Sequence, residues 1–145
     1  MREWVAAGLL LHASVVDIRH RRIPNGALVL AGGVGCLWAV VGGGAGGLIR
    51  ALVGGAAAIV WWPCVRWLGL GRGDLKLAMA LGILLGPGAA LEAPAWGFVA
   101  CAVWSGLEIV WCLRRHVRWR GREIAFAPWI ALGTGLFAWV HWPRV

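Results

Sequence analysis

Charged residues are scarce in this sequence. They make up 14% of its 145 residues, whereas a soluble domain contains about a quarter. The hydrophobic fraction is correspondingly high, at 61%. Small domains bury the smallest share of their surface, so a chain of this length cannot hide that many apolar side chains in its own core. The composition excludes an ordinary soluble domain and predicts one compact membrane domain over residues 1–145.

Paired cysteines are also absent. The four cysteines lie apart inside apolar runs, and no two have the Cys-x-x-Cys spacing of a zinc site or a redox pair. We therefore expect no metal site and no cofactor, and we interpret the cysteines as small buried hydrophobic residues. They are Cys36, Cys64, Cys101 and Cys112.

Apolar runs separated by clusters of glycine, proline or arginine predict about six transmembrane helices in one bundle. The protein is thus expected to be all-α and polytopic. The spans run from about Trp4 to Asp17, Ala27 to the glycine cluster at 42–47, Leu48 to Trp67, Asp74 to Pro87, Trp96 to Leu113, and Ile124 to Val140. The glycine cluster is predicted to form a tight turn, because glycine adopts backbone angles that other residues avoid.

Basic residues gather on one side of this arrangement and give the chain a net charge of +8. Most of them fall in the first, third and fifth connections, which are therefore predicted to be cytoplasmic, with both termini facing out. The fifth connection, residues 114–122, is expected to lie on anionic lipid head groups. No segment interleaves basic and aromatic residues as a single-stranded nucleic-acid platform does, so no nucleic-acid partner is expected.

Only two aspartates occur, and each stands at the end of an apolar run. Asp17 ends the first run, and Asp74 opens the fourth directly after Gly71 and Gly73. A carboxylate in or near the hydrocarbon is costly and indicates a functional site. Two carboxyl groups that meet share one proton, so that the ionised one can take a proton from water while the protonated one polarises a peptide carbonyl. We predict that the two aspartates form the catalytic pair of an intramembrane aspartic protease.

Each aspartate also has a purely structural interpretation. Asp74 can cap the fourth helix, and Asp17 can pair with Arg21 one turn later. A non-enzymatic small helical membrane protein therefore stays open as an alternative. Glu108 is interpreted as a buried acid of the fifth span that pairs with an arginine of the fifth connection.

Three segments together resemble the type IV prepilin peptidase family. Gly71-Arg72-Gly73-Asp74-Leu75-Lys76 matches the family's Gly-x-Gly-Asp-x-Lys signature. Asp17-Ile18-Arg19, followed by Arg22-Ile23-Pro24-Asn25, is similar to the first-aspartate motif of its short members. The segment from Phe126 to Gly133 resembles the late proline-containing segment. The Gly-x-Gly-Asp pattern is weak alone, but its combination with an upstream Asp and Ile-Pro-Asn in this order is specific.

The resemblance implies an aspartic endopeptidase of the inner membrane. Such enzymes remove the basic leader of a pilin-like precursor at the cytoplasmic face, just before the precursor's hydrophobic helix. Asp17 and Asp74 would then be catalytic. The residues expected to bind the substrate or shape the site are Arg19, Ile23, Pro24, Asn25, Gly71, Gly73, Lys76 and Pro128.

The chain departs from the long members of that family. Its first connection is too short for their inserted cytoplasmic domain with paired Cys-x-x-Cys, so we expect no N-methylation domain and peptidase activity only. This pattern is similar to the short form linked to tight-adherence (Flp-type) pili, with archaeal preflagellin-type peptidases as an alternative. The non-enzymatic alternative would then be a small helical membrane protein of pilus assembly or transport. Presenilin-type proteases share Gly-x-Gly-Asp but place a tyrosine before the other aspartate, and this sequence contains no tyrosine.

Overall fold

The structure is a computed structural model that describes residues 2–67, 70–115 and 125–141. Over those ranges the regular structure is entirely helical, which confirms the predicted all-α class. The elements are α1 (Arg2–His20), α2 (Asn25–Ala57), the 3-10 helix η1 (Ala58–Trp61), α3 (Trp62–Trp67), α4 (Arg72–Leu85), α5 (Pro87–Arg114) and α6 (Ala127–His141).

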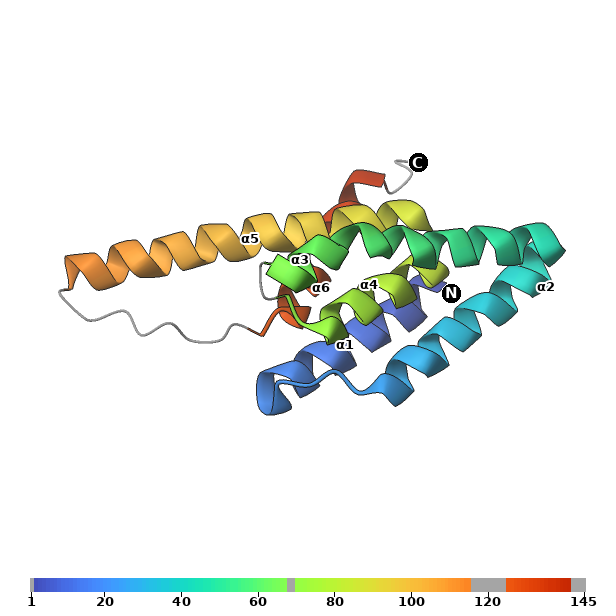
Figure 1. The fold of residues 1–145 in the computed structure, drawn as a ribbon, viewed down its shortest axis with the longest axis horizontal. Helices are drawn as coiled ribbons and strands as arrows, with labels where there is room; N and C mark the ends of the chain where they lie inside the picture. Colours follow the sequence, from blue (N-terminus) through green and yellow to red (C-terminus); the bar gives the residue numbers. More distant parts are fainter. Residues whose placement is uncertain (1, 68–69, 116–124, 142–145) are drawn as a thin grey trace.

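The longest element, α2, bends back on itself at Gly44. This residue has φ 57° and ψ −142°, a conformation that glycine reaches without steric cost. A Cβ on Gly47 would overlap the carbonyl group of Ala39. Next to the bend, the backbones of the two arms are therefore in direct contact. The bend lies inside the glycine cluster for which the sequence predicts a turn, and Figure 1 shows the two arms diverging from it.

Two helical stretches are long and apolar enough to cross a membrane, namely Asn25–Trp67, which contains the bend, and Pro87–Arg114. The helices α1, α4 and α6 have 19, 14 and 15 residues. At 1.5 Å per residue they are about 21 to 29 Å long, against a hydrocarbon core of about 30 Å. The number of six spans remains a prediction.

One predicted boundary is wrong. The fifth helix begins at Pro87, directly after the turn at Gly86, and not near Trp96. Gly86 has φ 102°, and the proline that follows it has the fixed φ that suits the first position of a helix. The glycine and proline that end α4 therefore also start α5, and no loop separates the two helices.

The central helix of the bundle is α4. Leu77, Leu81 and Leu84 are completely or almost completely buried and share one hydrophobic cluster with residues of α1, α2 and α6. On the side facing α2, a Cβ on Gly54 would overlap the carbonyl of Gly82, and the reverse also holds. Small residues allow helices to approach this closely, as packing in lipid requires.

The helix α5 extends well beyond its neighbours at its C-terminal end (Figure 1). Large apolar side chains there are exposed, for example Trp104 at 58% and Leu107 at 61%. Glu108 is exposed as well, so the prediction of a buried acid at this position is wrong. No helix of the described chain packs over this part of α5, which explains why a residue inside an apolar run lies on the surface.

Candidate active site

Asp17 lies in the last turns of α1 and is only 8% exposed. Its Oδ2 accepts a hydrogen bond of 3.1 Å from the backbone N–H of Ala127, 110 positions along the chain. Ala127 is the first residue of α6. The first N–H groups of a helix have no acceptor in their own helix, and the helix dipole gives that end a partial positive charge. The start of α6 therefore holds the Asp17 carboxyl group in place.

Asp74 lies in the first turn of α4 and is 7% exposed. Its Oδ2 accepts a hydrogen bond of 3.2 Å from the N–H of Gly71. A Cβ on Gly71 would lie 2.7 Å from that oxygen, so any side chain at position 71 would push the carboxyl group away. The first glycine of the Gly-x-Gly-Asp segment is thus required for the close approach of Asp74. Asp74 does cap α4, as its structural interpretation anticipates, but it uses one oxygen to do so.

The second oxygen of Asp74 is available for another partner. Oδ1 is buried and accepts no hydrogen bond from any residue in the described ranges. A buried polar atom without a hydrogen bond is costly. The Asp17 carboxylate is close enough to act electrostatically on Asp74. The structure thus brings the two aspartates to one end of the bundle and leaves one buried carboxyl oxygen there without a hydrogen bond from the described residues.

The second glycine of the segment, Gly73, faces the connection between α1 and α2. A Cβ on Gly73 would come within 3.3 Å of the Cβ of Ile23, which is tighter than ordinary packing allows. Pro24 follows Ile23 in an extended conformation and ends the connection directly before α2. The segments that contain the two aspartates therefore pack against each other through Ile23 and Gly73.

A hydrogen bond joins the same two segments on their exposed side. The Nζ of Lys76 donates to the Oδ1 of Asn25 over 2.9 Å, and so connects the start of α4 to the start of α2. Arg19 is exposed on α1, and within the described residues no hydrogen bond joins it to either aspartate. Pro128 is half-buried and is the second residue of α6.

Sequence reasoning missed two contributions to this site. It singled out Pro128 but not its neighbour Ala127, because a backbone donor carries no side-chain signature. The only signal was a proline in the first turn of a helix, where proline is favoured. It also passed over Ser14, whose Oγ is buried and has no hydrogen-bond partner in the described chain. Ser14 lies three residues before Asp17, on the same face of α1.

An apolar groove of about 510 Å³ runs between α1 and α6. Ser14 lines one part of it and Trp4 another, and these residues lie about 15 Å apart along α1. Small residues contributed by both helices, Ala7, Ala131 and Gly135, also line it. Within the part of the chain that the structure describes, His, Cys, Asp and Glu side chains form no group of three that could hold a metal ion.

The sequence matches the model of the type IV leader peptidase family over residues 4–107. The matched region contains both aspartates and ends within α5, before α6 begins. Comparisons with curated proteins and with solved structures found no match. The match covers most of the chain, and the long apolar helices agree with a membrane location. With its two aspartates at one end of an apolar helical bundle, the chain therefore belongs to the type IV leader peptidase family.

Proposed function

We propose that this membrane peptidase is an aspartic endopeptidase in which Asp17 and Asp74 are the catalytic pair. One observation carries the proposal. The carboxylate of Asp17 acts electrostatically on the carboxyl group of Asp74, which is buried and comes from a different helix, and one oxygen of Asp74 has no hydrogen bond from the described chain. The family match supports the peptidase activity, and the two aspartates are the proposed general acid and general base.

The proposed reaction is the hydrolysis of a peptide bond by water. The ionised carboxylate removes a proton from a water molecule, whose oxygen then attacks the peptide carbonyl carbon while the protonated carboxyl group donates to the carbonyl oxygen. The C–N bond breaks, and the leaving nitrogen takes up a proton from the pair. The N–H groups of Ala127 and Gly71 hold both groups in position throughout.

The proposed substrate is a pilin-like precursor that has a basic leader followed by a hydrophobic helix. From the basic connections we infer that the aspartate end of the bundle faces the cytoplasm and that both termini lie on the other side. The proposed site-shaping residues are those of the two aspartate segments: Arg19, Ile23, Pro24, Asn25, Gly71, Gly73 and Lys76, with Pro128 from α6. The family resemblance favours the short, peptidase-only form that serves Flp-type pili.

The groove between α1 and α6 is suited to the hydrophobic helix of that precursor. It reaches Ser14, which lies about one helical turn from Asp17, and apart from Glu3, Ser14 and Thr134 its lining residues are small or apolar. Small residues allow a second helix to approach closely in lipid. A substrate helix in this groove would end next to the aspartates, where its chain must leave the helical conformation to be cut.

The proposal is tested by leader cleavage with the purified protein and a pilin-like precursor in lipid. Asp17→Asn and Asp74→Asn keep the shape of each side chain but prevent the two groups from sharing a proton. Each is expected to lower the cleavage rate by at least about 10²-fold, the contribution of one general acid or base. Glu108→Gln makes the same chemical change at an exposed acid and should cleave like the wild type.

Cleavage at the wild-type rate by either aspartate variant would remove the aspartic mechanism. It would favour the structural alternative, in which Asp74 only caps α4 and Asp17 only fixes the start of α6. The amide variants also separate catalysis from folding, because the amide oxygen of asparagine can still accept the N–H of Gly71 or Ala127. Equal thermal unfolding temperatures would show that the variants are folded.

A further inference from the structure

A polar pocket lies at the end of the bundle opposite the aspartates. It has a volume of about 380 Å³ and lies between the start of α1, the bend of α2 and the turn between α4 and α5. Arg2 on α1 lines this pocket, and it lies 15 positions before Asp17, or about 22 Å along the helix. The pocket is therefore separate from the candidate active site.

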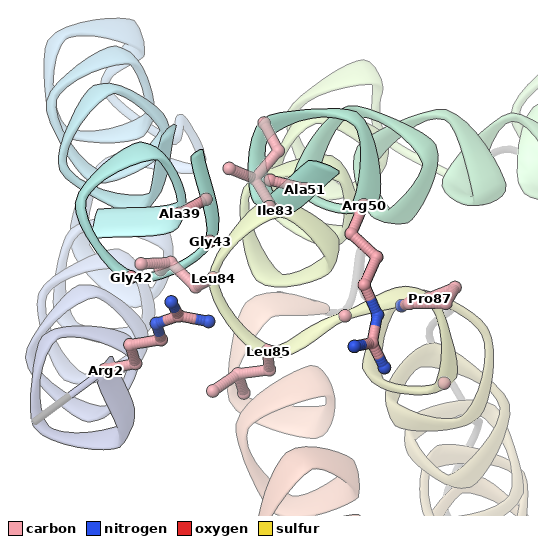
Figure 2. A pocket seen from close by; sticks show the side chains of 13 residues that line it. Arg2, Ala39, Gly42, Gly43, Arg50, Ala51, Ile83, Leu84, Leu85 and Pro87 are labelled. Carbon is pink, nitrogen blue, oxygen red and sulfur yellow. The ribbon is translucent and has the colours of Figure 1, made fainter. Parts of the chain in front are cut away.

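Two arginines from different helices line the pocket. Arg2 is half-buried, and one of its Nη atoms donates to the carbonyl oxygen of Trp38 over 3.3 Å, which leaves most of its five N–H donors available. Arg50 is exposed and has no hydrogen bond or ion pair with another described residue. Figure 2 shows both side chains extending toward the pocket around the end of α4, with the Arg50 guanidinium group near Pro87.

Among the described residues, no aspartate or glutamate lines this pocket beside the two arginines. The nearest acid along α5 is Glu92, whose Oε1 lies 3.7 Å from the position that a Cβ on Gly88 would occupy and 3.8 Å from Nε2 of His141. Two guanidinium groups that line one pocket repel each other unless an anion lies between them, because opposite charges at close range stabilise each other and like charges do not.

The backbone around the arginines is open to a ligand. Gly43 and Gly86 line the pocket, and a Cβ on either would meet no atom within 4 Å. Gly88 lies in the first turn of α5, where N–H groups have no acceptor in the helix and the dipole favours negative charge. The start of this helix adds to the positive potential of the two guanidinium groups.

We propose that this pocket binds a phosphate group. Guanidinium groups match phosphate oxygens in geometry and form strong charge-assisted hydrogen bonds with them. The pocket lies at an end of the apolar bundle, the level at which phospholipid head groups are found. The phosphate can come from an anionic phospholipid or from free phosphate. In either case it would join α1 to the bend of α2 and to the turn between α4 and α5.

The test measures the thermal unfolding temperature of the full chain in a maltoside detergent, which contains no phosphate. Phosphatidylglycerol and inorganic phosphate are added in separate arms, and native mass spectrometry counts retained lipid. At about ten times the dissociation constant, the true ligand should raise the Tm by about 3 to 8 °C. The double variant Arg2→Gln/Arg50→Gln should show no such rise. Arg66→Gln, which removes an exposed arginine from α3, should respond like the wild type.

The arms distinguish the source of the phosphate. A rise with phosphatidylglycerol alone identifies a lipid site, and a rise with inorganic phosphate identifies a site for the free anion. No rise in either arm, or an equal rise in the double variant, would overturn the proposal. Should the double variant fail to fold, the single variant Arg50→Gln decides, since Arg50 is exposed and has no described partner. Its affinity should fall at least about tenfold, and wild-type affinity would overturn the proposal.

Discussion

The two ends of the bundle differ in the sign and the accessibility of their charged side chains. At one end, two carboxyl groups are buried, and a backbone N–H holds an oxygen of each of them. At the other end, two guanidinium groups line an open pocket in which no acid takes part. Fixed, buried groups suit chemistry that depends on position, whereas accessible donors suit the binding of a ligand from outside. The proposed catalytic pair and the proposed phosphate site therefore lie at opposite ends of the helices, about 22 Å apart along α1.

The largest effect on the aspartate end is expected from adding a methyl group at Gly71. Gly71→Ala places a carbon 2.7 Å from Oδ2 of Asp74, so the carboxyl group must move. A misplacement of about 1 Å can cost about 10²-fold in rate, and we expect a loss of that size in leader cleavage. Gly26→Ala, where a Cβ meets no atom within 4 Å, is the matched control. A Gly71→Ala variant as active as this control would contradict the role assigned to Gly71.

The next largest effect is expected where α6 holds Asp17. Ala127→Pro removes the N–H that donates to Asp17 Oδ2, and a buried carboxylate oxygen loses its partner. We expect a fall in cleavage rate of about tenfold or more, together with a loss of about 1 to 3 kcal/mol in the free energy of unfolding. Ala127→Gly keeps the N–H and should retain most of the activity. If both variants behave alike, packing at position 127 matters and the hydrogen bond does not.

A smaller effect is expected in the groove between α1 and α6, and it tests whether this groove binds the hydrophobic helix of the substrate. Gly135→Leu fills part of the groove between α1 and α6, and a Cβ at this position meets no atom within 4 Å. We expect the KM for a full-length precursor to rise about tenfold. Cleavage of a leader peptide without the hydrophobic helix should not change. Gly106→Leu adds the same side chain at an open position of α5, and an equal rise in KM there would argue against the groove.

The smallest effect is expected at the exposed hydrogen bond between Lys76 and Asn25. Lys76→Met removes the donor and keeps most of the side chain length. Exposed polar interactions contribute little to stability, about 0 to 1 kcal/mol. The free energy of unfolding measured with denaturant should therefore change by no more than this. We expect the cleavage rate to fall less than about threefold. A loss as large as that of an aspartate variant would show that Lys76 touches the substrate directly.

Local features of the chain could be predicted from the sequence, and contacts made by its backbone could not. The helical class follows from long apolar runs, and the bend of α2 from the glycine cluster that contains Gly44. The aspartates were noticeable because they are the only two and stand at the ends of apolar runs. The Ala127 hydrogen bond connects positions 110 residues apart through a backbone N–H group. Nearly every residue type has this group, so the residue at position 127 does not reveal the contact.

The arginine pocket and the exposure of Glu108 also depend on how the helices are arranged, which the sequence does not show. Arg2 and Arg50 are 48 positions apart and come together only because α2 bends and α1 packs beside it, so the sequence shows two unrelated charges. Glu108 lies within an apolar run, and such a run implies burial on average. Whether a given position is covered depends on where the neighbouring helices end, and α5 continues past them.

The bend at Gly44 has a consequence for chirality. Its φ of 57° and ψ of −142° are the mirror image of the extended polyproline conformation, which every L-residue adopts easily. A D-alanine placed there by chemical ligation would therefore meet its own preferred backbone angles, whereas an L-alanine would be strained. The hairpin formed by α2 thus contains one position at which a D-residue is a better building block than an L-residue.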